Sequence, residues 1–186
     1  MRRAWRAYDA GDLAKAEKFF AAVLQAEPRN FDALHGLGLI NYRRGRLDAA
    51  LALIQTALQA DLTRADGFSS LGLVFLALKD FTRALTSFDE GLRLAPHDFD
   101  LINRRGVALL ELGRVDEALA AFDRALAGDE NHREALGNRG NALIKLNRAA
   151  DALESYDRAL ASASGNAQLL TNRAVALRRL DGRRKR

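Results

Sequence analysis

The sequence predicts an all-α solenoid of antiparallel helix pairs, with about eleven helices in its 186 residues. The first support is a period of 34 residues that runs along the chain without an insertion or a deletion. The second is the chemistry of the repeated positions, which carry a small residue on the first helix of each pair and an alanine and a bulky residue on the second. A fixed period is typical of arrays in which each repeat packs only on its neighbours.

The repeated positions define how the helices of a pair should meet. The small residues of the first helices are Gly38, Gly72, Gly106 and Gly140. On the second helices, the alanines are Ala16, Ala50, Ala84, Ala118 and Ala152, and the bulky residues are Phe20, Ile54, Phe88, Phe122 and Tyr156. Short side chains on both helices allow the two backbones to approach, and larger side chains fill the remaining space. We therefore expect the alanines to be buried between helices.

The elements follow in order from this period. We expect repeats at residues 1–30, 31–64, 65–98, 99–132 and 133–166, then a terminal helix at 167–180 and a basic tail at 181–186. Gly11, Gly45 and Gly113 occupy the turns inside repeats, where the left-handed backbone region favours glycine, and Lys79 and Asn147 take the same place in two repeats.

The ends of the helices also carry recognisable residues. Pro28 and Pro96 end the second helices of the first and third repeats. Asn30, Asp98 and Asn166 precede first helices, where a side-chain oxygen can accept from a free N–H group.

Taken together, the Leu37-Gly38 and Leu71-Gly72 pairs and the periodic alanines, aromatics and prolines resemble the tetratricopeptide repeat (TPR) family. The resemblance covers essentially the whole chain. It implies a single right-handed superhelix over residues 1–180, with first helices lining a concave groove. It also implies a protein–protein interaction scaffold that binds a partner peptide or helix in that groove.

Composition excludes several classes of protein. The absence of cysteine rules out disulfides and thiolate chemistry. No apolar run reaches the roughly 18 residues of a membrane span, and the N-terminal stretch lacks the apolar core of a signal peptide. We therefore expect a cytoplasmic protein without a membrane partner. The excess of arginine over lysine suggests a bacterial source.

No arrangement of residues in the sequence indicates catalysis, so we expect no enzyme activity, cofactor or metal. The three histidines, His35, His97 and His132, lack metal-ligand spacing. His97 and His132 fall in turns between repeats, and we expect both to be solvated. The resemblance places His35 on the groove surface.

The resemblance directs attention to the concave face of the first helices. Asparagine is a poor helix-interior residue, and its amide can pair with a peptide backbone. Exposed apolar residues on the same face could anchor side chains of the partner. The predicted partner-binding residues are Leu39, Tyr42, Leu73, Leu76, Asn103, Arg104, Leu110, Asn138, Asn141 and Asn172. Solvated polar surface is an equally good interpretation of the asparagines.

Two charged columns recur with the same period. Asp32, Asp66, Asp100 and Glu134 lie in first turns, where a carboxylate complements the helix dipole. Arg105, Arg139 and Arg173 stand before the small residue, where the TPR family usually has leucine, and their guanidinium groups could reach the acidic column.

An alternative function is a substrate-recruiting or regulatory arm of a larger enzyme, such as a glycosyltransferase whose catalytic part lies outside this chain. Asn138 and Asn172 match the asparagine pattern of glycosyltransferase-linked repeats in part. A reading frame that continues past Arg186 would favour this alternative. Self-association through the open ends of the array is a further possibility.

In the sequence, only the basic C-terminal tail indicates binding to nucleic acid. The net charge of +5 arises within residues 178–186, which carry six basic residues against Asp181, and the rest of the chain sums to zero. We expect residues 181–186 to be disordered or frayed beyond the last helix, because charged residues bury little surface. Deleting residues 182–186 should abolish any weak, salt-dependent binding to nucleic acid in a filter-binding assay. Tight binding that survives the deletion would place the nucleic-acid site in the helical array.

Overall fold

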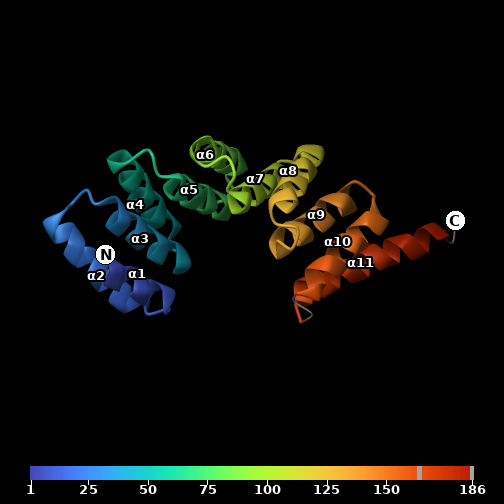
Figure 1. Ribbon diagram of the computed structural model, residues 1–186, viewed down its shortest axis with the longest axis horizontal. Coiled ribbons are helices and arrows are strands. Elements are labelled where there is room, and N and C mark those ends of the chain that lie inside the picture. The colour runs from blue at the N-terminus through green and yellow to red at the C-terminus, as the bar shows by residue number, and fades with distance from the viewer. Residues whose placement is uncertain (163–164, 185–186) are drawn as a thin grey trace. The chain divides into compact units, whose positions relative to one another are not determined.

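The computed structural model describes residues 1–162 and 165–184, and this part of the chain contains eleven helices and no strand. The predicted all-α array of helix pairs is therefore confirmed. The chain divides into two compact units, Met1–Pro96 and His97–Arg186, and the boundary falls two residues before the expected end of the third repeat (Figure 1). Within each unit, a helix packs mainly on its sequence neighbours, as expected of stacked repeats.

The first unit holds three helix pairs. They are α1 (Arg2–Asp9), α2 (Leu13–Ala26), α3 (Phe31–Arg43), α4 (Leu47–Ala60), α5 (Ala65–Ala77) and α6 (Phe81–Leu94). The second unit holds two pairs and one further helix. They are α7 (Phe99–Glu111), α8 (Val115–Gly128), α9 (Arg133–Lys145), α10 (Ala149–Ala161) and α11 (Ala167–Arg184).

The small residues bring the two helices of each pair together as predicted. All five periodic alanines are fully buried, with 0% exposure. A Cβ atom placed on Gly72 would lie 2.3 Å from the Phe88 ring, and one on Gly140 would lie 2.4 Å from Tyr156. Each ring therefore occupies the space that a side chain on the first helix would need.

The turns within the pairs adopt the predicted left-handed backbone. The φ angles are +77° at Gly11, +71° at Gly45 and +77° at Gly113. Lys79 and Asn147 adopt the same conformation, each with a φ of 59°. The turn therefore keeps its geometry in the two repeats where lysine or asparagine replaces the glycine.

The predicted caps are also confirmed. The Asn30 side chain accepts from the Ala33 N–H at 3.0 Å, and Asp98 accepts from Leu101 at 2.9 Å. Asn166 accepts from the N–H of Leu169 at 3.0 Å. These bonds satisfy N–H groups that have no partner within the helix.

The C-terminal helix extends further than the sequence predicts. Helix α11 runs to Arg184, so the expected end at residue 180 and the frayed tail from 181 are corrected for residues 181–184. Glycine at 182 disfavours a helix by about 1 kcal/mol, but the arginines at 183 and 184 are good helix formers and no proline interrupts the segment, so α11 continues past residue 180. Residues 185–186 of the expected tail lie outside the described residues. None of the helices in the described part combines the length and apolarity of a membrane span.

Lys79 tests the cost of the left-handed turn. A side chain in this conformation costs roughly 1–2 kcal/mol, so Lys79→Gly should raise the free energy of unfolding by about 1 kcal/mol despite the greater freedom of glycine in the unfolded chain. The reverse change at an equivalent turn, Gly45→Lys, should lower it by a similar amount. Urea denaturation of the two variants would measure both effects. A destabilised Lys79→Gly variant would contradict the interpretation.

Candidate functional site

A groove in the second unit brings together three of the predicted partner-binding residues. It lies on α9 and α11 and has a volume of about 320 Å³. Its lining residues are Arg133, Glu134, Gly137, Asn138, Asn141, Asn166, Gln168, Leu169 and Asn172. The groove is therefore rich in amides, which can donate and accept hydrogen bonds without carrying charge.

The asparagines are held by one another across successive first helices. Asn138 Nδ2 donates to Asn103 Oδ1 at 3.0 Å, and Asn172 Nδ2 donates to Asn141 Oδ1 at 2.9 Å. The Tyr156 hydroxyl also donates to Asn141 Oδ1, at 2.8 Å. Burial raises the pKa of Tyr156 to about 12, so this hydroxyl keeps its proton at neutral pH and remains a donor. Two donors on one oxygen fix the orientation of the Asn141 amide.

Not every predicted residue offers surface to a ligand. Asn103 is 3% exposed and Leu110 is 7% exposed, so both contribute mainly to the interior of the second unit. Arg104 lines a separate hollow of about 320 Å³ beside Asp100 and His132.

The apolar residues predicted for the partner lie in the first unit. Leu39, Tyr42, Leu73 and Leu76 are all half-buried. Leu39 packs against the core that contains Phe20, and Tyr42 packs against a second core. These two side chains therefore support the fold as well as contribute surface.

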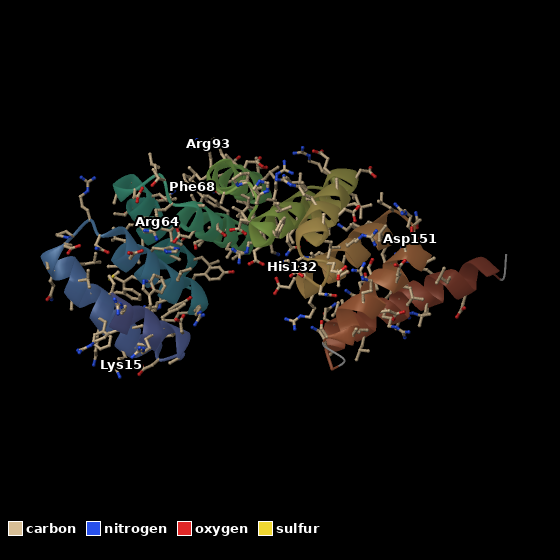
Figure 2. The ribbon with its side chains drawn as sticks, viewed as in Figure 1. Lys15, Arg64, Phe68, Arg93, His132 and Asp151 are labelled. Carbon is tan, nitrogen blue, oxygen red and sulfur yellow. The ribbon has the colours of Figure 1, made fainter. Side chains whose placement is uncertain are left out.

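The acidic column takes part in contacts between repeats that the sequence did not predict. Arg64 Nη2 lies 2.9 Å from both Asp32 Oδ1 and Asp66 Oδ2 (Figure 2). In the second unit, Asp100 Oδ1 lies 2.9 Å from His132 Nε2. The carboxylates thus join successive first helices near their N-termini, in addition to complementing the helix dipole.

A second set of contacts joins the other ends of the first helices. Arg43 Nη1 donates to the Tyr8 carbonyl at 3.4 Å, and Lys145 Nζ donates to that of Leu110 at 3.3 Å. Arg179 Nη1 donates to the carbonyl of Ile144 at 2.7 Å. Each acceptor belongs to the last turn of a helix, where carbonyl groups lack a partner within the helix and a cation is favoured.

His132 is not the solvated turn residue that the sequence predicts. Its side chain is 11% exposed, and its Nδ1 accepts from the Ala135 N–H at 3.4 Å. The ring caps α9 while its Nε2 faces Asp100, and a neutral ring with its proton on Nε2 satisfies both contacts. His97 is exposed, as predicted.

His35 is buried rather than part of the groove surface. It is 4% exposed and lies near the rings of Trp5 and Phe31. Its Nε2 lies 2.8 Å from Ser70 Oγ, and its Nδ1 lies 3.9 Å from Asp66 Oδ2. The order Ser–His–Asp resembles a hydrolytic triad. However, Ser70 is 7% exposed and the second distance exceeds a hydrogen bond, so this cluster serves to join α3 and α5.

The arginines before the small residues bind a different set of carboxylates from the one expected. Arg139 Nε donates to Asp123 of α8 at 2.6 Å, and Arg173 Nε donates to Asp157 of α10 at 2.5 Å. These partners lie on the preceding second helix and not in the acidic column. The arginine stems thus extend toward the helix on which α9 or α11 packs.

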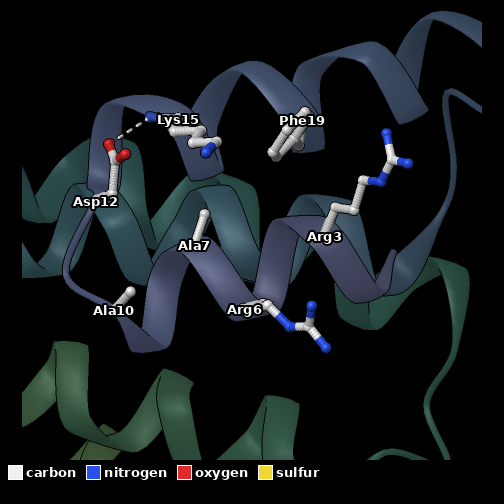
Figure 3. Close-up of a pocket in the computed structure, with 7 residues that line it drawn as sticks. All are labelled: Arg3, Arg6, Ala7, Ala10, Asp12, Lys15 and Phe19. Atoms are coloured by element: carbon white, nitrogen blue, oxygen red, sulfur yellow. Dashed lines mark hydrogen bonds between the residues drawn. The ribbon is translucent and has the colours of Figure 1, made fainter.

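A larger hollow of about 490 Å³ lies on α1 and α2, in a region that the sequence did not single out (Figure 3). Arg3, Arg6 and Lys15 line it, and their side chains have no ion-pair partner among the described residues. Arg6 stands where later repeats bury Ile40, Val74, Ala108 and Ala142. This face of α1 is therefore polar where the equivalent faces of later first helices are apolar.

Comparisons with known proteins agree with the repeat architecture. One tetratricopeptide repeat profile matches residues 1–65 and 69–133, and a second matches residues 109–174. The comparison with curated proteins finds no match.

Several solved structures share the fold. TTC0263, a TPR protein of Thermus thermophilus, superposes with a TM-score of 0.78 at 24% identity, over 95% of this chain and 96% of its own. The structure of pilF from Pseudomonas aeruginosa superposes with a TM-score of 0.85 at 18% identity, over 97% of this chain and 82% of its own. YrrB is described as a TPR protein with an unusual peptide-binding site. It superposes with a TM-score of 0.72 at 24% identity, over 90% of this chain and 87% of its own. At these identities the likeness concerns the fold alone.

The buried His35 predicts a dependence of stability on pH. Burial, and secondarily Arg64, hold the pKa of His35 below its ordinary value of 6.5, although Asp66 opposes the shift. As the pH falls below 6.5, the unfolded chain takes up a proton that the folded chain resists, so the free energy of unfolding should fall. His35→Gln should show a smaller fall between about pH 7.5 and 5.5 in urea denaturation. Equal pH dependence in the two proteins would contradict this account.

Proposed function

Because the chain belongs to the tetratricopeptide repeat family, we propose that it is a protein-interaction scaffold that binds an extended or helical segment of a partner on its first helices. TPR proteins bind protein or peptide partners, and the proposal assigns this role to the amide groove on α9 and α11. The described likeness to YrrB, a protein with an unusual peptide-binding site, supports the class of ligand.

The observation that carries the proposal is a free donor beside a free acceptor. The contacts described above use Asn138 Nδ2 and Asn141 Oδ1, and they leave Asn138 Oδ1 and Asn141 Nδ2 without a partner among the described residues. The two amides are three residues apart on α9, so they are neighbours on one helix face. A peptide backbone offers the complementary N–H and C=O groups whatever its side chains are.

The mutual bonds of the asparagines favour binding in a second way. Asn103, Tyr156 and Asn172 restrain the amides before any ligand arrives. A ligand therefore does not need to order these side chains, and that ordering would otherwise cost roughly 0.5–1.5 kcal/mol for each one.

Leu39, Tyr42, Leu73 and Leu76 are proposed as a separate apolar contact surface on the first unit. Their half-exposed side chains could hold an apolar residue of a partner, and an aromatic anchor such as Tyr42 can dominate the energy of binding. Truncating Tyr42 would also loosen the core, so the groove on the second unit offers the cleaner test.

Peptides selected from a random-sequence display library against the whole chain would test the proposal. Gln168 lines the groove and is exposed on α11, so Gln168→Trp should obstruct the groove without altering the core. We expect it to weaken the selected peptides by about tenfold or more, and Asn138→Ala to weaken them by roughly two- to tenfold, as expected for one lost hydrogen bond. Isothermal titration calorimetry would measure both changes.

Ala150→Trp is the matched control, because Ala150 is exposed on α10 and lines none of the hollows described above. It should leave the affinity unchanged. Equal losses in the two tryptophan variants, or none in either, would place the binding surface elsewhere.

A further inference from the structure

Gly137 stands at a position where earlier repeats place a buried polar side chain. The equivalent residues include His35 in the second repeat and Asn103 in the fourth, with 4% and 3% exposure. His35 Nε2 lies 2.8 Å from Ser70 Oγ, and Asn103 Oδ1 accepts from Asn138 Nδ2 at 3.0 Å. Each of these contacts joins one first helix to the next first helix. Gly137 has no side chain with which to make the same contact to α11.

Packing between helices does not account for a glycine at this position. A Cβ atom on Gly36, Gly72 or Gly140 would lie 2.3–2.4 Å from an aromatic ring. Outside its own helix, a Cβ atom on Gly137 would meet only the Leu169 side chain, at 3.0 Å, and that side chain borders the open groove. Since glycine is a poor residue for the middle of a helix, Gly137 weakens α9 without a ring that requires it.

The space left open by Gly137 belongs to the amide groove. We call this part of the groove the Gly137 notch, and its residues are Gly137, Asn138, Leu169 and Asn172. Asn172 lies one period after Asn138, and Asn138 donates to the side chain of Asn103. At the equivalent place Asn172 finds no side chain on Gly137. It donates to Asn141 instead, and its Oδ1 accepts from Gln168 at 2.9 Å.

The notch keeps one unused donor and one unused acceptor. An amide nitrogen carries two hydrogens, and Asn172 Nδ2 uses one of them for Asn141. Asn138 Oδ1 has no partner among the described residues, and its two lone pairs can serve both a side chain and a backbone N–H. A side chain that satisfies the notch must accept from Asn172 and donate to Asn138. The carboxamide of asparagine or glutamine does both.

Charged side chains fit the notch less well. A carboxylate can only accept, so it would leave Asn138 Oδ1 unpaired, and an ammonium group can only donate, so it would leave the N–H of Asn172 unpaired. Covering a polar group without giving it a partner costs free energy. Arg133 and Glu134 line the same groove, so its formal charges cancel and favour neither sign. The notch thus favours a neutral amide.

We propose that the Gly137 notch takes the side chain of an asparagine or glutamine from the partner segment, in the place that Asn103 fills in the preceding repeat. The amide oxygen of that side chain would accept from Asn172, and its nitrogen would donate to Asn138. The proposal rests on the function proposed above, because the same segment pairs its backbone with the amide groove. It adds a requirement on the partner's sequence, which is a carboxamide at one fixed place.

Selection from a random-sequence display library, run in parallel on the parent protein and on Gly137→Asn, tests the proposal. The new side chain should occupy the notch from within, as Asn103 does one period earlier, and the variant should melt at or above the temperature of the parent. Peptides selected by the parent should carry asparagine or glutamine at one aligned position. Those selected by Gly137→Asn should not.

The contribution of the carboxamide is measured by changing the peptide. Leucine in place of an aligned asparagine, or methionine in place of a glutamine, keeps the volume and removes both hydrogen bonds. We expect either change to weaken binding to the parent protein by about tenfold or more in calorimetry. Gly137→Asn should weaken the original peptide by a similar factor and the altered peptide much less, because both changes remove the same contact.

Ala150→Asn is the matched control, because it introduces the same side chain at an exposed position outside the groove. It should leave the affinity of the selected peptides unchanged. The comparison of the two peptides on the parent protein stands whether or not Gly137→Asn folds, and circular dichroism would establish its folding.

Two kinds of result would overturn this proposal and leave the proposed function intact. In one, peptides lose binding in Gln168→Trp but carry no aligned carboxamide, or carry an aligned serine or threonine, so that a hydroxyl fills the notch. In the other, they bind folded Gly137→Asn as tightly as the parent. If no selected peptide depends on Gln168, both proposals fail.

Discussion

The contact between the glycine of a first helix and the ring of its second helix sets the spacing on which the rest of the structure depends. A Cβ atom at Gly72, Gly106 or Gly140 would lie 2.3–2.5 Å from the facing ring, so no side chain fits between the backbone of the first helix and that ring. The buried alanines allow the same approach from the other side. Once this spacing repeats every 34 residues, side chains on successive first helices come within hydrogen-bond range.

Most of the fold could be predicted because its determinants are local or strictly periodic. Asn30 caps the helix that starts beside it, and Lys79 keeps a turn whose place the period defines. The polar contacts of the first helices could not be predicted in the same way. Asn103 meets Asn138 and Asp100 meets His132 only after two repeats are stacked, and the rotamer of each side chain decides the pairing. Separations of 32 and 35 residues do not stand out in a 34-residue pattern.

The polar residues of the first helices serve both the fold and the proposed binding role. Arg64 and His132 join these helices near their N-termini, and Arg43, Lys145 and Arg179 join them near their C-termini. Between the two ends, the asparagines of the second unit bind one another and leave Asn138 Oδ1 and Asn141 Nδ2 without a partner among the described residues. The amide groove could be anticipated from residue type alone. The restraints on its amides, which favour recognition of a peptide backbone, could be seen only in the structure.

The contacts between repeats also make the order of the repeats chemically significant. In their cores the repeats are nearly equivalent, since each sets a small residue against a bulky one, so exchanging two of them would preserve the core contact. Where successive first helices meet they are not equivalent, because His35 meets Ser70 at the place where, two repeats later, Asn103 meets Asn138. A duplicated repeat would therefore fit in the core, but its polar side chains would not match those of the repeats on either side. The residues at these contacts thus depend on the order of the repeats, and this dependence would select against recombination between repeats of equal length.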